Sequence, residues 1–197
     1  MMELCLHEAL KLNDCPVCHC IKKEFDEYMK WFKIEGYKEP SVCKSIQEAG
    51  YICDRHKSIL KDMGEYLNNT FDFILPIDLE AFKSPKSIKK MAKHLMCKFC
   101  LEEERIEKLS IMQLCKIVAS KKGLSIYMNS SANLCKRHLI LTIDQLKDSS
   151  AAEAILNKYK KRLSQTIEAL EAYFNSLDYN SAEKKNKRAF QEALKLY

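Results

Sequence analysis

The residues of this sequence best suited to chemistry are cysteines and histidines at fixed spacings. The segments CPVC and CKFC each hold two cysteines three positions apart, and CDRH and CKRH each hold a cysteine and a histidine three positions apart. One pair of each kind supplies three thiolates and one imidazole, which close a tetrahedron around Zn²⁺ and leave no position for a catalytic water. The predicted metal ligands are Cys15, Cys18, Cys53, His56, Cys97, Cys100, Cys135 and His138.

The two ligand sets repeat in register. The first cysteine precedes the Cys-x-Arg-His cysteine by the same interval in each set, from position 15 to 53 and from 97 to 135, so one constant shift superposes the sets. Arg55 then superposes on Arg137, and each arginine could donate to a thiolate or a nearby carbonyl. Such a register predicts an internal duplication.

The equal spacing favours pairing within each repeat, so that each Cys-x-x-Cys pair shares an ion with the Cys-x-Arg-His pair that follows it. The alternative crosses between the halves, with Cys15 and Cys18 joining Cys135 and His138. His19 and Cys20 lie beside the first pair and could replace a ligand, but the second copy has leucine and glutamate at those positions.

Redox chemistry is the main alternative to structural zinc. Three cysteines and a histidine can also hold an iron–sulfur cluster. A thioredoxin-type dithiol needs a strand–helix setting that this chain lacks, and disulfides would leave both histidines unexplained. Thiol chemistry would also have the cysteines outside the ligand sets, which are Cys5, Cys20, Cys43 and Cys115.

Helices must position these ligands. Two ligands three residues apart can face one ion at the entrance of a helix, where exposed N–H groups and the positive dipole end favour thiolate. The chain has only four glycines and four prolines, which is typical of a mostly helical protein. Apolar residues recur every three or four positions after Cys18, from Ile21 to Phe32, as in an amphipathic helix.

The sequence predicts one all-α unit of duplicated helical repeats, each stapled by a Cys3His metal site. The repeats span about 10–70 and 92–149, a connector spans 71–91, and residues 150–197 form C-terminal helices. A long apolar stripe from Leu156 to Leu177 predicts a closing helix packed on both repeats, with a coiled-coil contact as the alternative.

The composition bounds the compartment and the partners. No signal peptide and no apolar run long enough for a bilayer is visible, so we expect a cytoplasmic protein without a membrane partner, in which ten cysteines favour metal over disulfides. The net charge of +6 and the basic run 184–188 keep nucleic-acid binding as an alternative. Six thiolates and two zinc ions would lower that charge by two, and acidic residues are interspersed throughout.

The motifs also resemble a known family. Tandem CPxC-type and Cys-x-Arg-His segments, followed by LEAYFNSLDYN and a leucine-rich last helix, resemble an uncharacterised bacterial and archaeal family called a domain of unknown function. The resemblance spans nearly the whole chain. It places the eight ligands on the family's Cys/His positions and Asp178 and Tyr179 on its Asp-Tyr pair, with Asn180 and Phe190 where a basic residue and a tryptophan are common.

The resemblance implies an architecture and no activity. The sequence contains no Ser-His-Asp arrangement, phosphate loop, glycine-rich nucleotide fingerprint or HExxH segment, so we expect no enzyme. The resulting hypothesis is a helical scaffold with two structural zinc ions that binds a protein partner.

Overall fold

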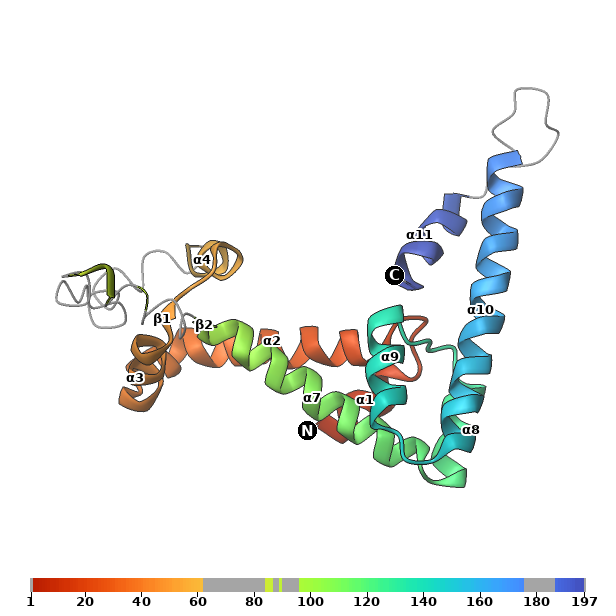
Figure 1. Ribbon diagram of the computed structural model, residues 1–197, viewed down its shortest axis with the longest axis horizontal. Helices are drawn as coiled ribbons and strands as arrows, with labels where there is room; N and C mark the ends of the chain where they lie inside the picture. Colours follow the sequence, from red (N-terminus) through yellow and green to blue (C-terminus); the bar gives the residue numbers. More distant parts are fainter. Residues whose placement is uncertain (1, 62–83, 87–88, 90–95, 176–186, 197) are drawn as a thin grey trace. The chain divides into compact units, whose positions relative to one another are not determined.

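The computed structural model describes residues 2–61, 84–86, 89, 96–175 and 187–196, and these are almost entirely helical (Figure 1). The predicted all-α class is confirmed. The elements are α1 (Met2–Ala9), α2 (Pro16–Ile34), a 3-10 turn η1 (Gly36–Lys38), α3 (Pro40–Ala49), β1 (Gly50–Tyr51), α4 (Asp54–Lys61), β2 (Met96–Cys97), α7 (Lys98–Val118), α8 (Lys121–Asn129), α9 (Lys136–Gln145), α10 (Ser149–Asn175) and α11 (Lys187–Leu196).

The chain forms two compact units. Unit 1 combines Met1–Lys23 with Glu107–Tyr197, and unit 2 is the continuous stretch Glu24–Ile106. Both boundaries fall inside long helices, so α2 and α7 each contribute one end to unit 1 and the other end to unit 2. Each unit therefore contains residues of both predicted repeats. The predicted connector lies almost wholly outside the described residues.

Four helices begin directly after a ligand cysteine, as the spacing predicts. Helices α2, α4, α7 and α9 start one residue after Cys15, Cys53, Cys97 and Cys135. The cysteine carbonyl accepts the first helical hydrogen bond, at 3.0 Å for Cys15, 2.9 Å for Cys53 and 2.8 Å for Cys135. The second ligand of each pair is the third helical residue. Both ligands therefore lie at the end where N–H groups are exposed.

Unit 1 is built around one apolar core. Its buried residues come from α1, the start of α2, the end of α7, α8, the segment before α9, α9 and α10, and include Leu6, Val17, Leu114, Leu134 and Ile155. Two ligand cysteines belong to the same core cluster. The unit-1 ligands are thus embedded in the apolar interior of their unit.

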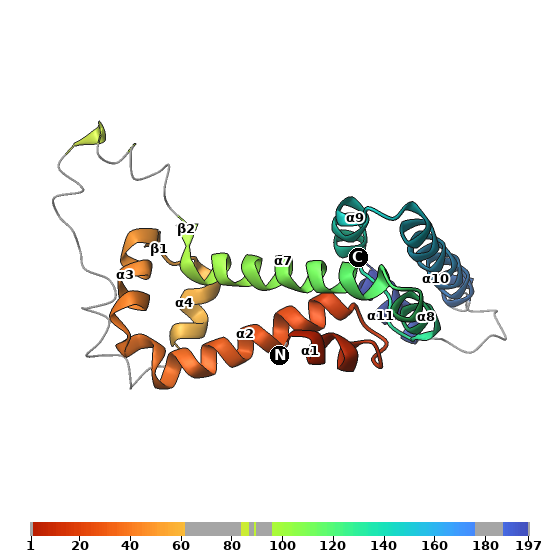
Figure 2. The same cartoon turned by 90° about the horizontal axis from the view of Figure 1, so that it is seen from below.

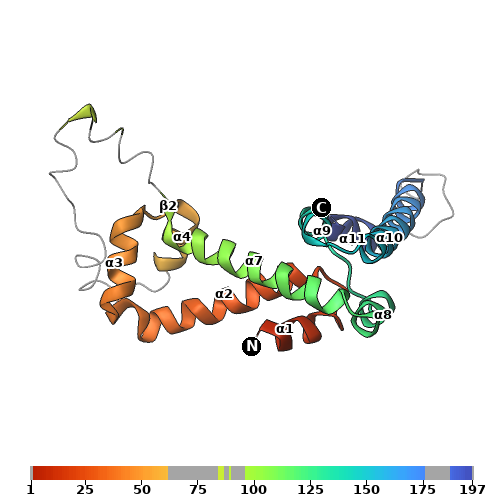
Figure 3. The same cartoon turned by 60° about the horizontal axis from the view of Figure 1, so that its bottom comes forward.

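Helix α8 is fixed at both ends. Its N-cap Ser120 accepts a hydrogen bond from the Gly123 N–H at 3.0 Å, and a Cβ on Gly123 would lie 2.0 Å from the Ile117 carbonyl oxygen. At the other end, Lys158 Nζ donates to the carbonyls of Tyr127 and Ser130, at 2.5 and 2.9 Å. These contacts hold α8 between the end of α7 and helix α10 (Figure 3).

The long helix predicted from about residue 150 is α10. Its main contacts are with α8, α9 and α11 (Figures 1 and 3). These three helices lie in the second predicted repeat or beyond it, but Ile155 of α10 also belongs to the core cluster that contains Cys15 and Val17 of the first predicted repeat. Much of its apolar stripe, including Leu163, Ile167 and Phe174, remains exposed.

Unit 2 is held by aromatic rings and by a short pair of strands. Phe32 of α2 and Phe99 of α7 meet edge to face, with ring centroids 5.3 Å apart. Strand β1 pairs with β2 in parallel register, Tyr51 opposite Cys97, next to helix α3 (Figure 2). This pairing brings the segment before α4 beside the segment before α7, and both segments carry ligands.

Candidate metal centres

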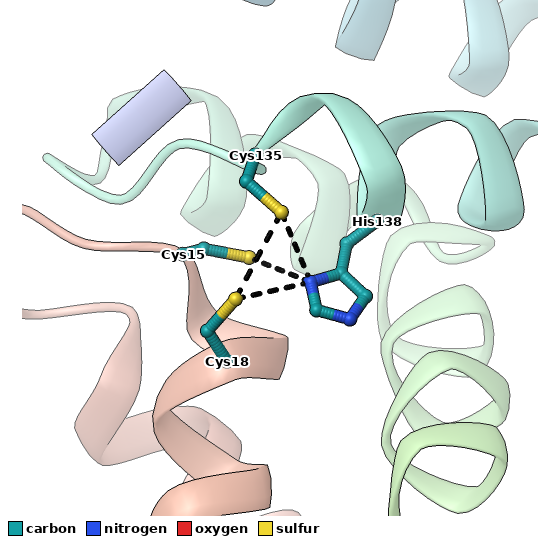
Figure 4. A group of neighbouring side chains, drawn as sticks. All are labelled: Cys15, Cys18, Cys135 and His138. Carbon is teal, nitrogen blue, oxygen red and sulfur yellow. Dashed lines mark hydrogen bonds between the residues drawn. The ribbon is translucent and has the colours of Figure 1, made fainter. Parts of the chain in front are cut away.

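The unit-1 cluster consists of Cys15, Cys18, Cys135 and His138 (Figure 4). All three sulfurs converge on the Nδ1 atom of His138, at 3.4 Å from Cys15, 3.2 Å from Cys18 and 3.2 Å from Cys135. The sulfurs of Cys18 and Cys135 are 3.8 Å apart. Two helix starts, those of α2 and α9, supply the four groups.

The unit-2 cluster consists of Cys53, His56, Cys97 and Cys100. Here the Nδ1 atom of His56 lies 3.1 Å from the sulfur of Cys53, 3.4 Å from Cys97 and 3.5 Å from Cys100. The sulfurs of Cys53 and Cys100 are 3.6 Å apart. The starts of α4 and α7 supply these groups.

Both clusters have the dimensions of a tetrahedral metal site. With Zn–S of about 2.3 Å and Zn–N of about 2.0–2.1 Å, a regular tetrahedron separates two sulfurs by about 3.8 Å and a sulfur from a nitrogen by about 3.5 Å. The ligand atoms of each cluster all lie within 4.8 Å of one another. The described residues thus contain two groups that could each hold one metal ion through four protein ligands.

The eight predicted ligands all come together, but the favoured pairing within each repeat is wrong. The Cys-x-x-Cys pair of the first repeat joins the Cys-x-Arg-His pair of the second, and the reverse holds in unit 2. The reason is the length of helix α2 (Pro16–Ile34), which carries the chain several turns along its axis away from Cys15 and Cys18. Cys53 comes after the far end of that helix, where strand β1 lies beside strand β2 at the start of α7.

Two glutamates that the sequence analysis missed contact the ligand histidines. In unit 1, Glu107 lies 2.9 Å from His138 Nε2 and accepts two hydrogen bonds from Arg137, at 2.8 and 2.9 Å. In unit 2, Glu103 pairs with Arg55, and its other carboxylate oxygen is 3.7 Å from His56 Nε2. The arginines of the Cys-x-Arg-His segments therefore bind carboxylates, not the predicted thiolates or carbonyls.

The signal for these glutamates was present but ambiguous. Helix α7 carries acidic residues at 102, 103, 104 and 107, and periodicity does not tell which of them face a histidine. Glu102 is used differently, since it pairs with Arg105 on the same helix.

In the unit-1 cluster the pKa of each ligand depends on the protonation of its neighbours before metal binds. Burial disfavours the imidazolium, but the neighbouring sulfurs of Cys135 and Cys15 outweigh it and raise the pKa of His138 to about 10. Hydrogen bonds from Cys15 and Cys18 lower the pKa of Cys135, whereas contacts with Cys135 and Cys15 raise the pKa of Cys18. One thiolate is thus stabilised by its protonated neighbours.

The unit-2 cluster titrates differently. Burial lowers the pKa of His56, and the nearby Arg55 acts in the same direction, against Glu103. Burial and the contact with Cys53 raise the pKa of Cys100 to about 12. Burial opposes ionisation of the Cys53 thiol. Hydrogen bonds from the backbone N–H of His56 and from Cys100 nevertheless lower the pKa of Cys53 overall.

The other cysteines and histidines that were considered stay outside the clusters. Cys5 and Cys20 are buried in the unit-1 core, Cys43 donates to the Tyr37 carbonyl at 3.1 Å, and Cys115 to the Thr142 carbonyl at 3.7 Å. His19 joins neither group. The positions predicted by resemblance, Asp178 and Tyr179, lie outside the described residues, as do residues 184–186 of the basic run.

No described helix is both long enough and apolar enough to cross a membrane.

Comparisons of the chain with protein-family models, with curated proteins and with solved structures give no match.

Proposed function

We propose that each cluster binds one structural zinc ion and that the two ions hold together a helical scaffold for a protein partner. The observation that carries this proposal is the convergence of eight Cys and His side chains, from four helix starts, into two sets of tetrahedral dimensions. Each set supplies all four ligands of a closed site. Closed Cys3His sites are typical of structural zinc, whereas catalytic zinc keeps a position open for water.

The compactness of the sets favours zinc over an iron–sulfur cluster. In an iron–sulfur cluster the protein ligands are divided among two or more irons, so all four cannot lie as close together as the ligands of one ion. In each set here, all four ligand atoms lie within 4.8 Å of one another. Here Cys18 and Cys135 are 3.8 Å apart, and Cys53 and Cys100 are 3.6 Å apart. Both distances fit ligands that share one ion.

The proposed ions join parts of the chain that are distant in sequence. The contact between Cys15 and His138 links residues 123 positions apart, and that between His56 and Cys97 links residues 41 positions apart. A closed zinc site supplies about 10–16 kcal/mol of apparent binding free energy, compared with about 5–15 kcal/mol for the whole stability of a typical domain. Zinc binding would therefore decide whether each unit folds.

Exposed apolar side chains support the scaffold role. Leu163, Ile167 and Phe174 on α10, with Phe190 and Leu194 on α11, are large apolar residues that remain exposed. Apolar side chains gathered on neighbouring helices are typical of protein-interaction surfaces. Reduced thiols are also required for both sites, which fits a reducing compartment such as the cytoplasm.

Helix positions support the proposed duplication. Helices α2 and α7 begin at Pro16 and Lys98, and α4 and α9 begin at Asp54 and Lys136. The interval between starts is the same in both pairs, and it is the shift that superposes the ligands. We propose that one ancestral unit supplied both halves and that their ligand pairs exchanged.

Elemental analysis together with an absorption spectrum tests the proposal. Protein purified without oxygen or chelator should contain about two zinc per chain, one for each Cys3His set, and show no visible band. The Cys43→Ser variant, which removes a thiol outside both clusters, should keep the same zinc content. Iron with a visible charge-transfer band, or the absence of any bound metal, would overturn the proposal of two structural zinc ions.

A further inference from the structure

The two clusters have the same ligand types but different surroundings. In the unit-1 cluster, Cys15 and Cys135 are 4% and 7% exposed and belong to the main apolar core. Cys18 is the only thiol of this set that reaches the surface. A reagent in solution therefore meets one sulfur of the three.

The unit-2 cluster is more open. Its sulfurs from Cys53 and Cys100 both keep partial access to solvent, whereas Cys97 is buried. The two accessible sulfurs are also neighbours, 3.6 Å apart.

The carboxylates beside the Nε2 atoms of the two ligand histidines also lie at different distances. Metal binding through Nδ1 leaves Nε2–H to donate, and a carboxylate acceptor there orients the ring and strengthens the ligand. Glu107 is 2.9 Å from His138 Nε2, which is a hydrogen-bond distance. Glu103 is 3.7 Å from His56 Nε2, which is too long for one. The Arg55 guanidinium, 3.3 Å from His56 Nε2, offers only donors.

We infer that the unit-2 cluster is a labile, oxidisable metal site, while the unit-1 cluster loses its ion much more slowly. This inference rests on the proposed metal binding and adds a regulatory role for one of the two sites. A peroxide is the oxidant. The thiolates of Cys53 and Cys100 give up two electrons and form one S–S bond, their bonds to the metal break, and the ion leaves. The peroxide O–O bond breaks, and with two protons hydrogen peroxide yields two molecules of water.

Local geometry permits that disulfide. A disulfide requires an S–S distance of about 2.05 Å, so the two sulfurs must approach by about 1.5 Å once the metal is gone. In unit 1 the corresponding pair, Cys18 and Cys135, is similarly close at 3.8 Å, but only Cys18 is open to the oxidant, whereas unit 2 offers both Cys53 and Cys100. Ligand access and the carboxylate support of the histidine, and not sulfur spacing, separate the two sites.

Metal release from the full-length zinc-loaded protein tests the inference. Hydrogen peroxide is added in the presence of a chromogenic zinc chelator, and the released zinc is followed with time. We expect two phases, with one zinc released about ten-fold or more faster than the other, since ligand access and carboxylate support both differ. Release of both ions in one phase would overturn the inference.

Peptide mapping identifies the site that reacts first. After the fast phase, the remaining thiols are alkylated and the chain is digested for mass spectrometry. We expect a Cys53–Cys100 disulfide, with Cys15, Cys18 and Cys135 still protected by metal. A disulfide within the unit-1 set, or its early alkylation, would contradict the assignment.

Two matched variants test thiols outside the clusters. Cys43→Ser in unit 2 and Cys115→Ser in unit 1 each remove a cysteine outside the clusters, and both should leave the two phases unchanged. Loss of the fast phase in either variant would move the reactive thiol away from the metal site. A protein that contains no metal would refute the proposed function, whereas two ions lost at equal rates would refute only this inference.

Discussion

Glu107 Oε1 lies 2.9 Å from His138 Nε2, while the Nδ1 atom of the same imidazole faces the three sulfurs of the unit-1 cluster. The carboxylate is fixed in turn by two hydrogen bonds from Arg137. The Nδ1 atom is thus placed to bind a metal ion, and the Nε2–H group is placed to donate to the carboxylate. Arg137 and His138 come from the same Cys-x-Arg-His segment, so that segment supplies both the ligand and the residue that orients its support.

The first prediction concerns this carboxylate. Glu107→Gln keeps the shape of the side chain but removes the charge, and should lower the zinc affinity of the unit-1 cluster by about 10–100-fold. Competition with a chelator of known affinity measures the change. Glu104→Gln, on the same helix and exposed, is the matched control and should leave the affinity unaltered. Equal behaviour of the two variants would mean that Glu107 does not support the ligand.

The second prediction compares two cysteines of unit 1. Cys135→Ser should abolish zinc binding at that cluster and unfold the unit, since a closed zinc site contributes about 10–16 kcal/mol. Cys115→Ser removes a half-buried thiol outside the cluster and should cost only about 1 kcal/mol. Far-UV circular dichroism and zinc content measure both effects. Native helicity and two zinc ions in Cys135→Ser would contradict the structural role.

The third prediction concerns pH. In the metal-free protein the pKa of His138 is raised to about 10 and that of Cys100 to about 12, so both hold protons at neutral pH. Metal binding requires neutral imidazole and thiolates, so it must release these protons. Zinc affinity should therefore rise with pH up to the highest of these pKa values and fall as the pH is lowered.

Calorimetry measures the released protons directly. Zinc titrations in buffers with different ionisation enthalpies give the number of protons lost on binding. A heat independent of the buffer would show that the ligands are already deprotonated without metal.

The fourth prediction concerns the end of α8. Lys158→Met keeps an unbranched side chain of similar length but removes the ammonium, which lies over the Tyr127 ring and binds two carbonyl oxygens. The change should lower the free energy of unfolding by about 1–3 kcal/mol, which urea denaturation of zinc-loaded protein measures. Lys160→Met, at an exposed position of the same helix, is the control and should leave the stability nearly unchanged. Equal midpoints for the two variants would contradict the prediction.

The fifth prediction concerns Gly123. A Cβ there would meet the Ile117 carbonyl oxygen at 2.0 Å, so Gly123→Ala must displace backbone. The substitution should cost about 1–3 kcal/mol despite alanine's higher helix propensity. Ser125→Ala, exposed on the same helix, isolates the propensity effect. A thermal melt in which Gly123→Ala matches Ser125→Ala would show that the turn can relax.

Local sequence patterns predicted the ligands and the helices well. Ligand pairs spaced three positions apart identify all eight side chains, because a cysteine just before a helix and the third helical residue share one face of its first turn. The apolar stripe after residue 150 predicts α10, which spans Ser149–Asn175. Both are properties of a few neighbouring residues.

Long-range relationships were harder to predict. Equal intervals between the motifs predicted pairing within each repeat. That pairing does not form, because helix α2 separates Cys15 and Cys18 at its start from the segment that follows its far end. Glu103 and Glu107 lie one helical turn apart on α7. Which arginine each of them binds depends on which Cys-x-Arg-His segment packs beside that part of the helix, and local sequence does not determine this. The internal duplication remains a prediction, as does the identity of the metal.

The division of the chain between units has a consequence for the order of its synthesis. Unit 2 is a continuous stretch, so its four ligands are all available once Ile106 has left the ribosome. Cys15 and Cys18 are the first ligands to be made, yet their partners Cys135 and His138 come much later, with Cys135 lying 117 positions beyond Cys18. The thiols of Cys15 and Cys18 must therefore stay reduced while unit 2 folds. A chain truncated after α7 would complete only one of its two centres.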